Sequence, residues 1–251
     1  MDKTQEASAI PQAVDVDVVR VFTDGDGDFG NELGIIWASE VTAGREQGIA
    51  RQLGFSETVF IGSVTGDTPN RTASIRIFTP AGELPFAGHP SVGVAWWLAR
   101  QGIPVALLVE KAGDVAVRYT GTGSEDASVT WISGKAAWAP EFEWMPLATP
   151  ADVDALDPAA FTAGKHYAWA WIDEAGGRMR SRMFAPGFDI REDEATGAAA
   201  VRITAMLGRD LTIEQGRGSR LATEIGDGDT VNVGGTTVFD RTTSLVPASA
   251  T

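Results

Sequence analysis

The chain contains two copies of one sequence pattern. The stretch RIFTPAGELPFAGHPSVGVAWW at Arg76 to Trp97 returns in altered form as RMFAPGFDIREDEATGAAAVRI at Arg182 to Ile203. In each copy a strand that ends in Arg-x-Phe-x-Pro leads through an acidic, turn-prone stretch to a glycine that opens a helix, Gly88 in the first copy and Gly197 in the second. Such a duplication indicates two similar halves, and a small ligand held between them would meet one helix start from each.

The length of 251 residues suits this division, because two halves of about 120 residues are each large enough to bury a core. We expect an N-terminal half at residues 1–122 and a C-terminal half at residues 123–251. The first residues, to about 13, resemble a disordered leader, and residues 242–251 resemble a tail of small residues.

Most apolar residues recur with a period of two, which predicts strands in both halves. Helices are few: we expect them at Thr42–Leu53, Pro90–Gln101, Ala151–Leu156 and Thr196–Leu207. The second and fourth of these are apolar or small nearly all round, which is typical of helices buried on every side. The predicted fold class is therefore α+β, with two pseudo-symmetric halves, each a curved mixed β-sheet wrapped around a central buried α-helix.

Composition excludes several classes of function. A formal charge of −14 and the lack of a basic patch argue against binding to nucleic acid or to anionic membranes. The N-terminus has no signal-peptide pattern and no apolar run approaches the length of a membrane span, so we expect a cytoplasmic protein. The chain has no Cys and two His, which leaves no thiolate nucleophile and argues against a metal site. We expect neither metal nor cofactor.

One glycine-rich stretch suggests other functions. Gly25 to Gly30 matches the dinucleotide-binding pattern formally, but Asp26 and Asp28 would place two anions where a pyrophosphate binds. The same stretch resembles the start of a calcium loop, yet the sixth position is Phe29 and the twelfth is Ile35. An ordinary acidic turn is the better interpretation, and this stretch is the sole support for a cofactor-dependent oxidoreductase.

Three ionisable residues are candidates for catalysis. His89 follows the glycine of the first helix start, where unsatisfied backbone N–H groups can bind a carboxylate, although a cap or a core hydrogen-bonding residue is an alternative. Asp193 precedes the second helix start, although a solvated turn explains it better on local grounds. Glu57 stands where a helix hands over to a strand, and partial burial there would raise its pKa toward that of a general base. No Lys or Arg occurs from Gln52 through Asn70 to oppose that shift.

The segments SETVF, RIFTPAGELPFAGHPSVGVAW, RMFAP, EDEATGAAA and IEQG, in this order and spacing, resemble the phenazine-biosynthesis PhzF-like family, which shares the diaminopimelate epimerase fold. The resemblance implies an active site between the halves, isomerase chemistry without a cofactor, and commonly a homodimer. It implies acid/base catalysis by Glu57 and active-site roles for His89 and Asp193. We expect the substrate to bind at the two helix starts, through Gly88, Thr196, Gly197 and Ala198.

The chain also departs from the family pattern. Glu32 stands where the family has Pro after Gly-Asn, and Glu194 and Ala198 replace Pro and Ser in the EDPATGSA motif. After Gly216 the usual Met-Gly-Arg-Pro-Ser run is shortened to Arg217-Gly218-Ser219-Arg220. We therefore expect an isomerase or epimerase acting on a small anionic, carboxylate-bearing metabolite, and these departures leave open whether that metabolite is the phenazine precursor. The alternative is a catalytically inactive protein of the same fold that binds a small anion or has a regulatory role.

Overall fold

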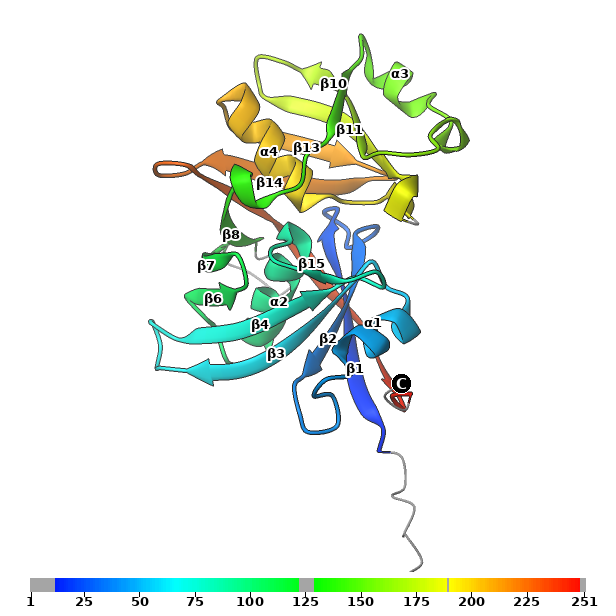
Figure 1. Ribbon diagram of the computed structural model, residues 1–251. Coiled ribbons are helices and arrows are strands. Elements are labelled where there is room, and N and C mark those ends of the chain that lie inside the picture. Colours follow the sequence, from blue (N-terminus) through cyan, green and yellow to red (C-terminus); the bar gives the residue numbers. More distant parts are fainter. Residues whose placement is uncertain (1–11, 122–128, 189, 249–251) are drawn as a thin grey trace, which may run out of the picture.

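Strands from both ends of the chain build the lower of two lobes in the computed structural model, which describes residues 12–121, 129–188 and 190–248 (Figure 1). The strands of this lobe pair in a closed ring, because β15 bonds to both β8 and β1. In ring order they are β1 (Val14–Thr23), β2 (Asn31–Trp37), β3 (Glu57–Thr65), β4 (Thr72–Phe78), β6 (Leu107–Glu110), β7 (Gly113–Thr120), β8 (Val129–Lys135) and β15 (Thr230–Leu245). The short β5 (Glu83–Leu84) pairs with β4.

The upper lobe continues the same sheet from β15 and stays open at its far edge. Its strands follow in the order β14 (Ser219–Ile225), β13 (Leu211–Gln215), β11 (Arg178–Ala185), β10 (His166–Asp173) and β9 (Glu143–Pro146), with β12 (Ile190–Asp193) beside β11. Parallel and antiparallel pairs occur in both lobes. The predicted fold class, a curved mixed sheet around one central helix in each half, is confirmed.

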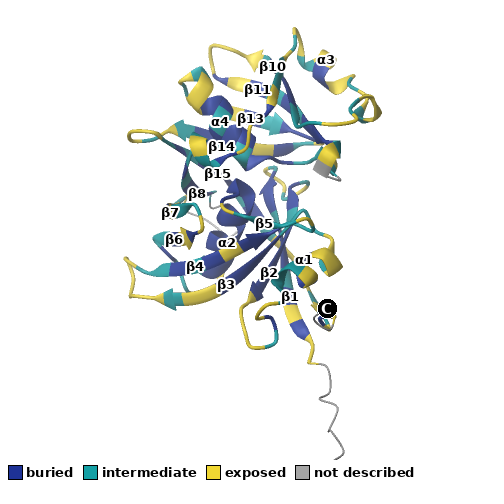
Figure 2. Ribbon diagram, viewed as in Figure 1, coloured by how far each residue is buried: buried dark blue, intermediate teal, exposed yellow. Residues whose placement is uncertain are grey.

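Each lobe has one buried helix. Helix α2 (Gly88–Arg100) is buried from its first residue through Leu98 and fills the ring of the lower lobe (Figure 2). Its Gly93 allows close packing, since a Cβ there would lie 2.6 Å from side-chain atoms of Leu33 and Val21. Helix α4 (Gly197–Leu207) occupies the corresponding place in the upper lobe and ends at Gly208, which has the left-handed conformation typical of a helix end. Both lie close to their predicted bounds.

Two smaller helices differ from the prediction. Helix α1 (Glu46–Leu53) begins four residues later than predicted, because the Thr42 hydroxyl bonds to the backbone of Ser39 and forms a preceding turn. Helix α3 (Pro150–Asp154) is capped by Thr149, whose hydroxyl accepts a hydrogen bond from the Asp152 N–H group. Short 3-10 helices occupy Ala136–Trp138, Pro158–Ala160 and Pro186–Phe188.

The last strand is shared by both lobes. Residues 231–234 of β15 pair with β14 of the upper lobe, while residues 230–235 pair with β8 and residues 236–245 with β1 in the lower lobe. The sequence pattern predicts two short strands and a tail from residue 242, because Gly234 and Gly235 suggest a break. The prediction of a tail there is wrong as far as Leu245. The glycines instead make room for aromatic rings, since a Cβ would lie 2.4 Å from Trp131 at Gly234 and 2.5 Å from Phe22 at Gly235.

Strand β15 links the two predicted halves, residues 1–122 and 123–251. In sequence it belongs to the second half, but its residues 236–245 complete the ring of the first lobe. The leader falls mostly outside the described residues, and β1 begins at Val14. Within the described part of the chain, no helix is both long enough and apolar enough to cross a membrane. The same residues contain no cluster of three or more His, Asp or Glu side chains arranged to hold a metal ion.

Candidate active site at the junction of the lobes

The starts of the two central helices touch each other. A Cβ added to Gly88 would lie 2.9 Å from the Gly197 Cα, and a Cβ added to Gly197 would lie 2.9 Å from the Gly88 Cα. Neither helix has a side-chain cap, since Ala87 and Thr196 at the N-cap positions make no capping hydrogen bond. The predicted convergence of the helix starts is confirmed, and their uncapped N–H groups place two sources of positive potential side by side. The contact leaves no space between the glycines, so a ligand would lie beside the pair.

Glu57 and His89 face each other at this junction. Glu57 begins β3, which runs parallel to β2, and His89 is the second residue of α2. The Glu57 Oε2 atom lies 3.4 Å from the His89 Nδ1 atom, and the two side chains are 14% and 5% exposed. Glu57 Oε2 and His89 Nε2 are buried without a hydrogen-bond partner among the described residues. Unsatisfied buried polar atoms are unusual in proteins, and here they are grouped beside two helix starts.

Burial controls the charge of this pair. It raises the pKa of Glu57 to about 8, with a second contribution from the charge of Asp193 and a smaller opposing hydrogen bond from Ser56. Burial lowers the pKa of His89 to about 3, against an opposing hydrogen bond that the imidazole donates to the Glu32 backbone. Near pH 7, Glu57 is therefore mostly protonated and His89 is neutral, so their contact is not an ion pair.

The predicted cause of the Glu57 shift is confirmed. Desolvation is its largest cause, and Arg76, an arginine outside the Gln52–Asn70 run that could have supplied a counter-charge, is bound elsewhere. Arg76 donates hydrogen bonds to Glu46 and Glu83 on the surface, and half of its side chain is exposed. Glu57 thus has no cationic partner among the described residues.

Asp193 lies at the end of β12 and is held by two side chains. The Asn31 amide donates to its Oδ1 atom at 2.5 Å, and the Thr196 hydroxyl donates to its Oδ2 atom at 2.5 Å. Burial raises the pKa of Asp193 above its ordinary value, and these two hydrogen bonds oppose that shift without cancelling it. Thr196 occupies the N-cap position of α4, but its hydroxyl makes no capping hydrogen bond because it donates to Asp193 instead.

Asn31 is a site residue that sequence reasoning missed. It lies at the start of β2 in the lower lobe and reaches the upper lobe, where its amide also donates to the Ala195 carbonyl at 3.1 Å. The signal that could have found it is the Gly30-Asn31 pair, which the chain shares with the family motif just before the departure at Glu32.

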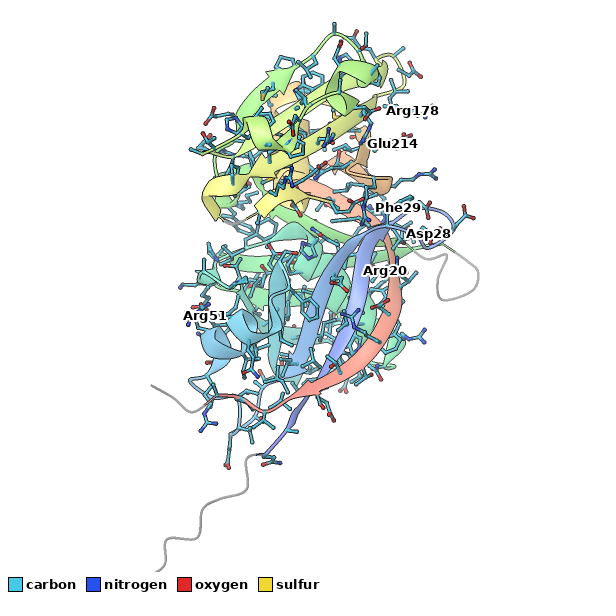
Figure 3. The ribbon with its side chains drawn as sticks, turned by 90° about the vertical axis from the view of Figure 1, so that its right-hand side faces the viewer. Arg20, Asp28, Phe29, Arg51, Arg178 and Glu214 are labelled. Atoms are coloured by element: carbon cyan, nitrogen blue, oxygen red, sulfur yellow. The ribbon has the colours of Figure 1, made fainter. Side chains whose placement is uncertain are left out.

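A cavity of about 540 Å³ opens beside these groups. Its lining includes Arg20, Asp28 and Phe29, which are labelled in Figure 3. The full lining consists of Arg20, Asp28, Phe29, Gly30, Asn31, Glu32, Gly54, Phe55, Ser56, Glu194 and Arg217. The cavity therefore reaches the chain neighbour of Glu57 and the hydrogen-bond partner of Asp193. The predicted site residues themselves, Glu57, His89, Asp193, Gly88, Thr196, Gly197 and Ala198, are not part of its wall.

The departures from the family motif compensate for one another. The Glu194 carboxylate accepts hydrogen bonds from the Arg217 backbone N–H at 2.9 Å, the Arg217 Nε at 3.1 Å and the Ser219 hydroxyl at 3.1 Å. The Gly30 N–H group of the other lobe donates to the same Ser219 hydroxyl oxygen at 3.0 Å. Glu194 thus fixes the shortened turn after Gly216 and, through it, part of the contact between the lobes.

The Gly25 to Gly30 stretch is an ordinary acidic turn. The Asp24 carboxylate accepts hydrogen bonds from the N–H groups of Asp26 and Asp28, and a strand, β2, follows. A dinucleotide-binding loop requires a helix start at that point. The structure therefore removes the sequence feature on which the oxidoreductase alternative depended.

A second buried glutamate lies under the start of α2. The Glu110 Oε1 atom is 2.6 Å from the Ser91 hydroxyl oxygen, which itself donates to the Ala87 carbonyl at 2.7 Å. Ser91 has one proton for these two contacts, so a protonated Glu110 would satisfy both. Burial, which raises the pKa of Glu110 to about 8, is consistent with that protonation.

We expect the free energy of unfolding to fall as the pH rises from about 5 to about 9, because both buried glutamates lose their protons. Their folded-state pKa values, about 8, lie above the ordinary value of 4.5. Their contribution to the free energy of unfolding is therefore complete below pH 4.5 and is lost as the pH rises to about 8. Glu110→Gln should flatten this pH dependence in urea titrations. A slope unchanged from the wild type would show that Glu110 is ionised in the folded protein.

Known proteins share both the sequence pattern and the fold of this chain. Residues 19–159 match the model of the family described as phenazine biosynthesis-like protein. A trans-2,3-dihydro-3-hydroxyanthranilate isomerase of Pseudomonas fluorescens is 32% identical over 219 residues, which cover 75% of this chain and 78% of that protein.

Solved structures show the similarity of fold. A phenazine biosynthesis protein of the PhzF family from Bacillus anthracis is similar with a TM-score of 0.73 at 18% identity, covering 93% of this chain and 99% of that one. A predicted epimerase from Pseudomonas aeruginosa gives a TM-score of 0.69 at 22% identity, covering 94% and 100% of the two chains. The chain therefore belongs to the phenazine biosynthesis-like protein family, as its motifs predicted, and its enzyme class is that of an isomerase.

Proposed function

We propose that this isomerase moves a proton from one position to another within a small carboxylate-bearing carbon acid, without a cofactor, at the junction of the lobes. One observation carries the proposal. The Glu57 carboxyl group is buried, has a pKa of about 8 and has an oxygen without a partner among the described residues, close to the place where two uncapped helix starts meet.

Glu57 is the proposed acid/base residue. In its ionised form it would take a proton from a carbon atom of the substrate, and the resulting acid would return the proton at another carbon. Its raised pKa makes it a stronger base than an exposed carboxylate and still allows an ionised fraction near neutral pH. His89, neutral and 3.4 Å away, would orient the substrate by hydrogen bonding, and Asp193 would do so from the other lobe.

The substrate carboxylate would bind at the helix starts. The backbone N–H groups near Gly88, Gly197 and Ala198 point outward from the first turns of α2 and α4, where the helix dipoles favour an anion. This local potential matters because the whole chain carries a formal charge of −14. Thr196 would contribute through its backbone, since its hydroxyl is already engaged by Asp193.

The first compound to test is trans-2,3-dihydro-3-hydroxyanthranilate, on which relatives of this chain are named as acting. Ala198 and the Glu194–Arg217 contact differ from the family motif, so the panel should include analogues that vary in ring substituents. Proton NMR in deuterated water would follow each compound. Product formation with incorporated deuterium supports the proposal, whereas carboxylate binding without any exchange across the panel would favour the anion-binding alternative.

The proposed role of Glu57 as a base predicts the pH dependence of the reaction. We expect kcat/KM to rise about tenfold per pH unit below a pH of about 8 and to level off above it, because only ionised Glu57 can take a proton. Initial rates in overlapping buffers measure this profile. A profile that falls as the pH passes 8 would mean that Glu57 must begin as the acid.

The homodimer and the cytoplasmic location stay predictions, as does the division of the chain near residue 122. Light scattering during size-exclusion chromatography would measure the oligomeric state directly.

A further inference from the structure

Gln215 lies at the end of β13, is fully buried and reaches the Asp193 region of the site. Its Nε2 atom donates to the Asp193 backbone carbonyl at 3.0 Å and to the Thr196 hydroxyl oxygen at 2.8 Å. A carbonyl oxygen only accepts hydrogen bonds, so the amide atom that faces it must be the nitrogen. The Gln215 oxygen points the other way, toward the Tyr167 hydroxyl oxygen 3.4 Å away.

This orientation decides where the Thr196 proton goes. The Thr196 oxygen accepts from Gln215, so the single hydroxyl proton is left for Asp193 Oδ2, which lies 2.5 Å away. The other Asp193 oxygen accepts from the Asn31 amide, also at 2.5 Å. A donor on each oxygen favours the ionised form of a carboxyl group.

Glu57 has weaker support, from a single Ser56 hydrogen bond. Its Oε2 atom has no hydrogen-bond partner among the described residues, and His89 beside it is neutral. Because one carboxyl group of the pair has two strong donors and the other has an unsatisfied oxygen, a proton shared by the site is best placed on Glu57. The negative charge on Asp193 strengthens that preference, since it opposes the ionisation of Glu57.

The other ionisable groups around Asp193 do not reverse this preference for an ionised Asp193 and a protonated Glu57. Glu194, the next residue, opposes its ionisation, but its own charge is compensated by Arg217. Tyr167 stays neutral because burial raises its pKa, and its hydroxyl donates to Ser181 at 2.9 Å. Arg180 lies near Tyr167 and donates to backbone carbonyls, among them Gly216.

We propose that Gln215 is a positioning residue: through Thr196 it keeps Asp193 the anion of the site, so that the migrating proton resides on Glu57. The inference rests on the proposed proton transfer by Glu57. Gln215 itself need not touch the substrate. Its effect is to direct a hydroxyl proton that could otherwise rotate away from Asp193.

The test is a carbon-13 NMR titration of the whole protein labelled at the Asp and Glu side-chain carboxyl carbons, which needs no substrate. Thr196→Val removes the hydroxyl at nearly constant shape, and Gln215→Met removes the amide that directs it. We expect both changes to raise the Asp193 pKa by about one unit or more, because a donor to the charged form is lost. The Glu57 titration, recorded in the same spectra, should shift down over any pH range in which the substitution leaves Asp193 neutral.

Two controls make the result specific. Thr196→Ser keeps the hydroxyl and should restore both titrations to those of the wild type. Thr204→Val removes another fully buried hydroxyl of α4, which bonds to Thr223 at 2.6 Å, and should leave both titrations unchanged. If one of the two test substitutions, Thr196→Val or Gln215→Met, prevents folding, the other decides the question through the same titration.

Unchanged Asp193 titration in the folded variants would overturn the inference. The outcome is separable from that of the proposed function. If the Asp193 pKa shifts as expected but Glu57→Gln retains full turnover, the hydrogen bonds from Gln215 through Thr196 act on Asp193 and Glu57 is not the catalytic base. If the Asp193 pKa does not shift while Glu57→Gln loses turnover, only the positioning role of Gln215 is refuted.

Discussion

Glu57→Gln is expected to lower turnover of the true substrate by roughly 10²–10⁴-fold while the protein stays folded. The amide has nearly the shape of the carboxylic acid that Glu57 is near neutral pH, so packing around the 14%-exposed side chain should change little. It cannot take a proton from carbon, however. Steady-state rates measure the loss of turnover, and far-ultraviolet circular dichroism shows whether the variant stays folded.

Glu110→Gln is the matched control for this experiment. Glu110 is also buried, and burial also raises its pKa to about 8. It packs under the start of α2, where it bonds to Ser91, and has no place in the proposed proton transfer. It should keep turnover close to that of the wild type. Equal losses in both variants would indicate damage to α2 instead of loss of a catalytic base.

Gly88→Ala and Gly197→Ala should each lower the free energy of unfolding by about 1–3 kcal/mol, the usual cost of overpacking. The added Cβ would lie 2.9 Å from backbone atoms of the facing helix, which cannot move aside as a flexible side chain could. The two helix starts would be forced apart, so ligand binding at the junction should weaken as well. Urea denaturation measures the stability change.

Gly48→Ala tests whether the effect comes from the contact. Gly48 lies inside α1, and a Cβ there would have open space around it. This change should raise the free energy of unfolding by about 0.5–1 kcal/mol, because alanine favours the helix over glycine. If the substitutions at Gly88 and Gly197 were as harmless as this one, the two helix starts would not be packed as described.

Much of the fold could be predicted from the sequence because the signals are local. Alternating apolar residues indicate most of the strands, and the apolar stretches after Gly88 and Gly197 indicate both central helices. The short strands β5, β9 and β12 were missed, since two to four residues carry too little periodicity. The shared strand β15 was divided because glycines that serve distant aromatic rings look like a turn in sequence.

The site could be predicted only in part, because some of its contacts join residues that are distant in sequence. Glu57, His89 and Asp193 stand in recognisable motifs, and the run without Lys or Arg around Glu57 indicated its raised pKa. The direction of the Thr196 hydroxyl depends on Gln215, which is distant in sequence. The bond from Asn31 to Asp193 joins residues 162 positions apart. Such contacts follow from the packing of the two lobes, which no local pattern encodes.

The most direct test of the account is the entry of solvent deuterium at the isomerised carbon, compared between the wild type and Glu57→Gln by proton NMR of the recovered substrate and product. If Glu57 takes and returns the proton, the wild type should incorporate deuterium as the product forms, and the variant should lose exchange by the same roughly 10²–10⁴-fold as turnover. Equal exchange in the two proteins would contradict the account and leave Asp193 or His89 as the base.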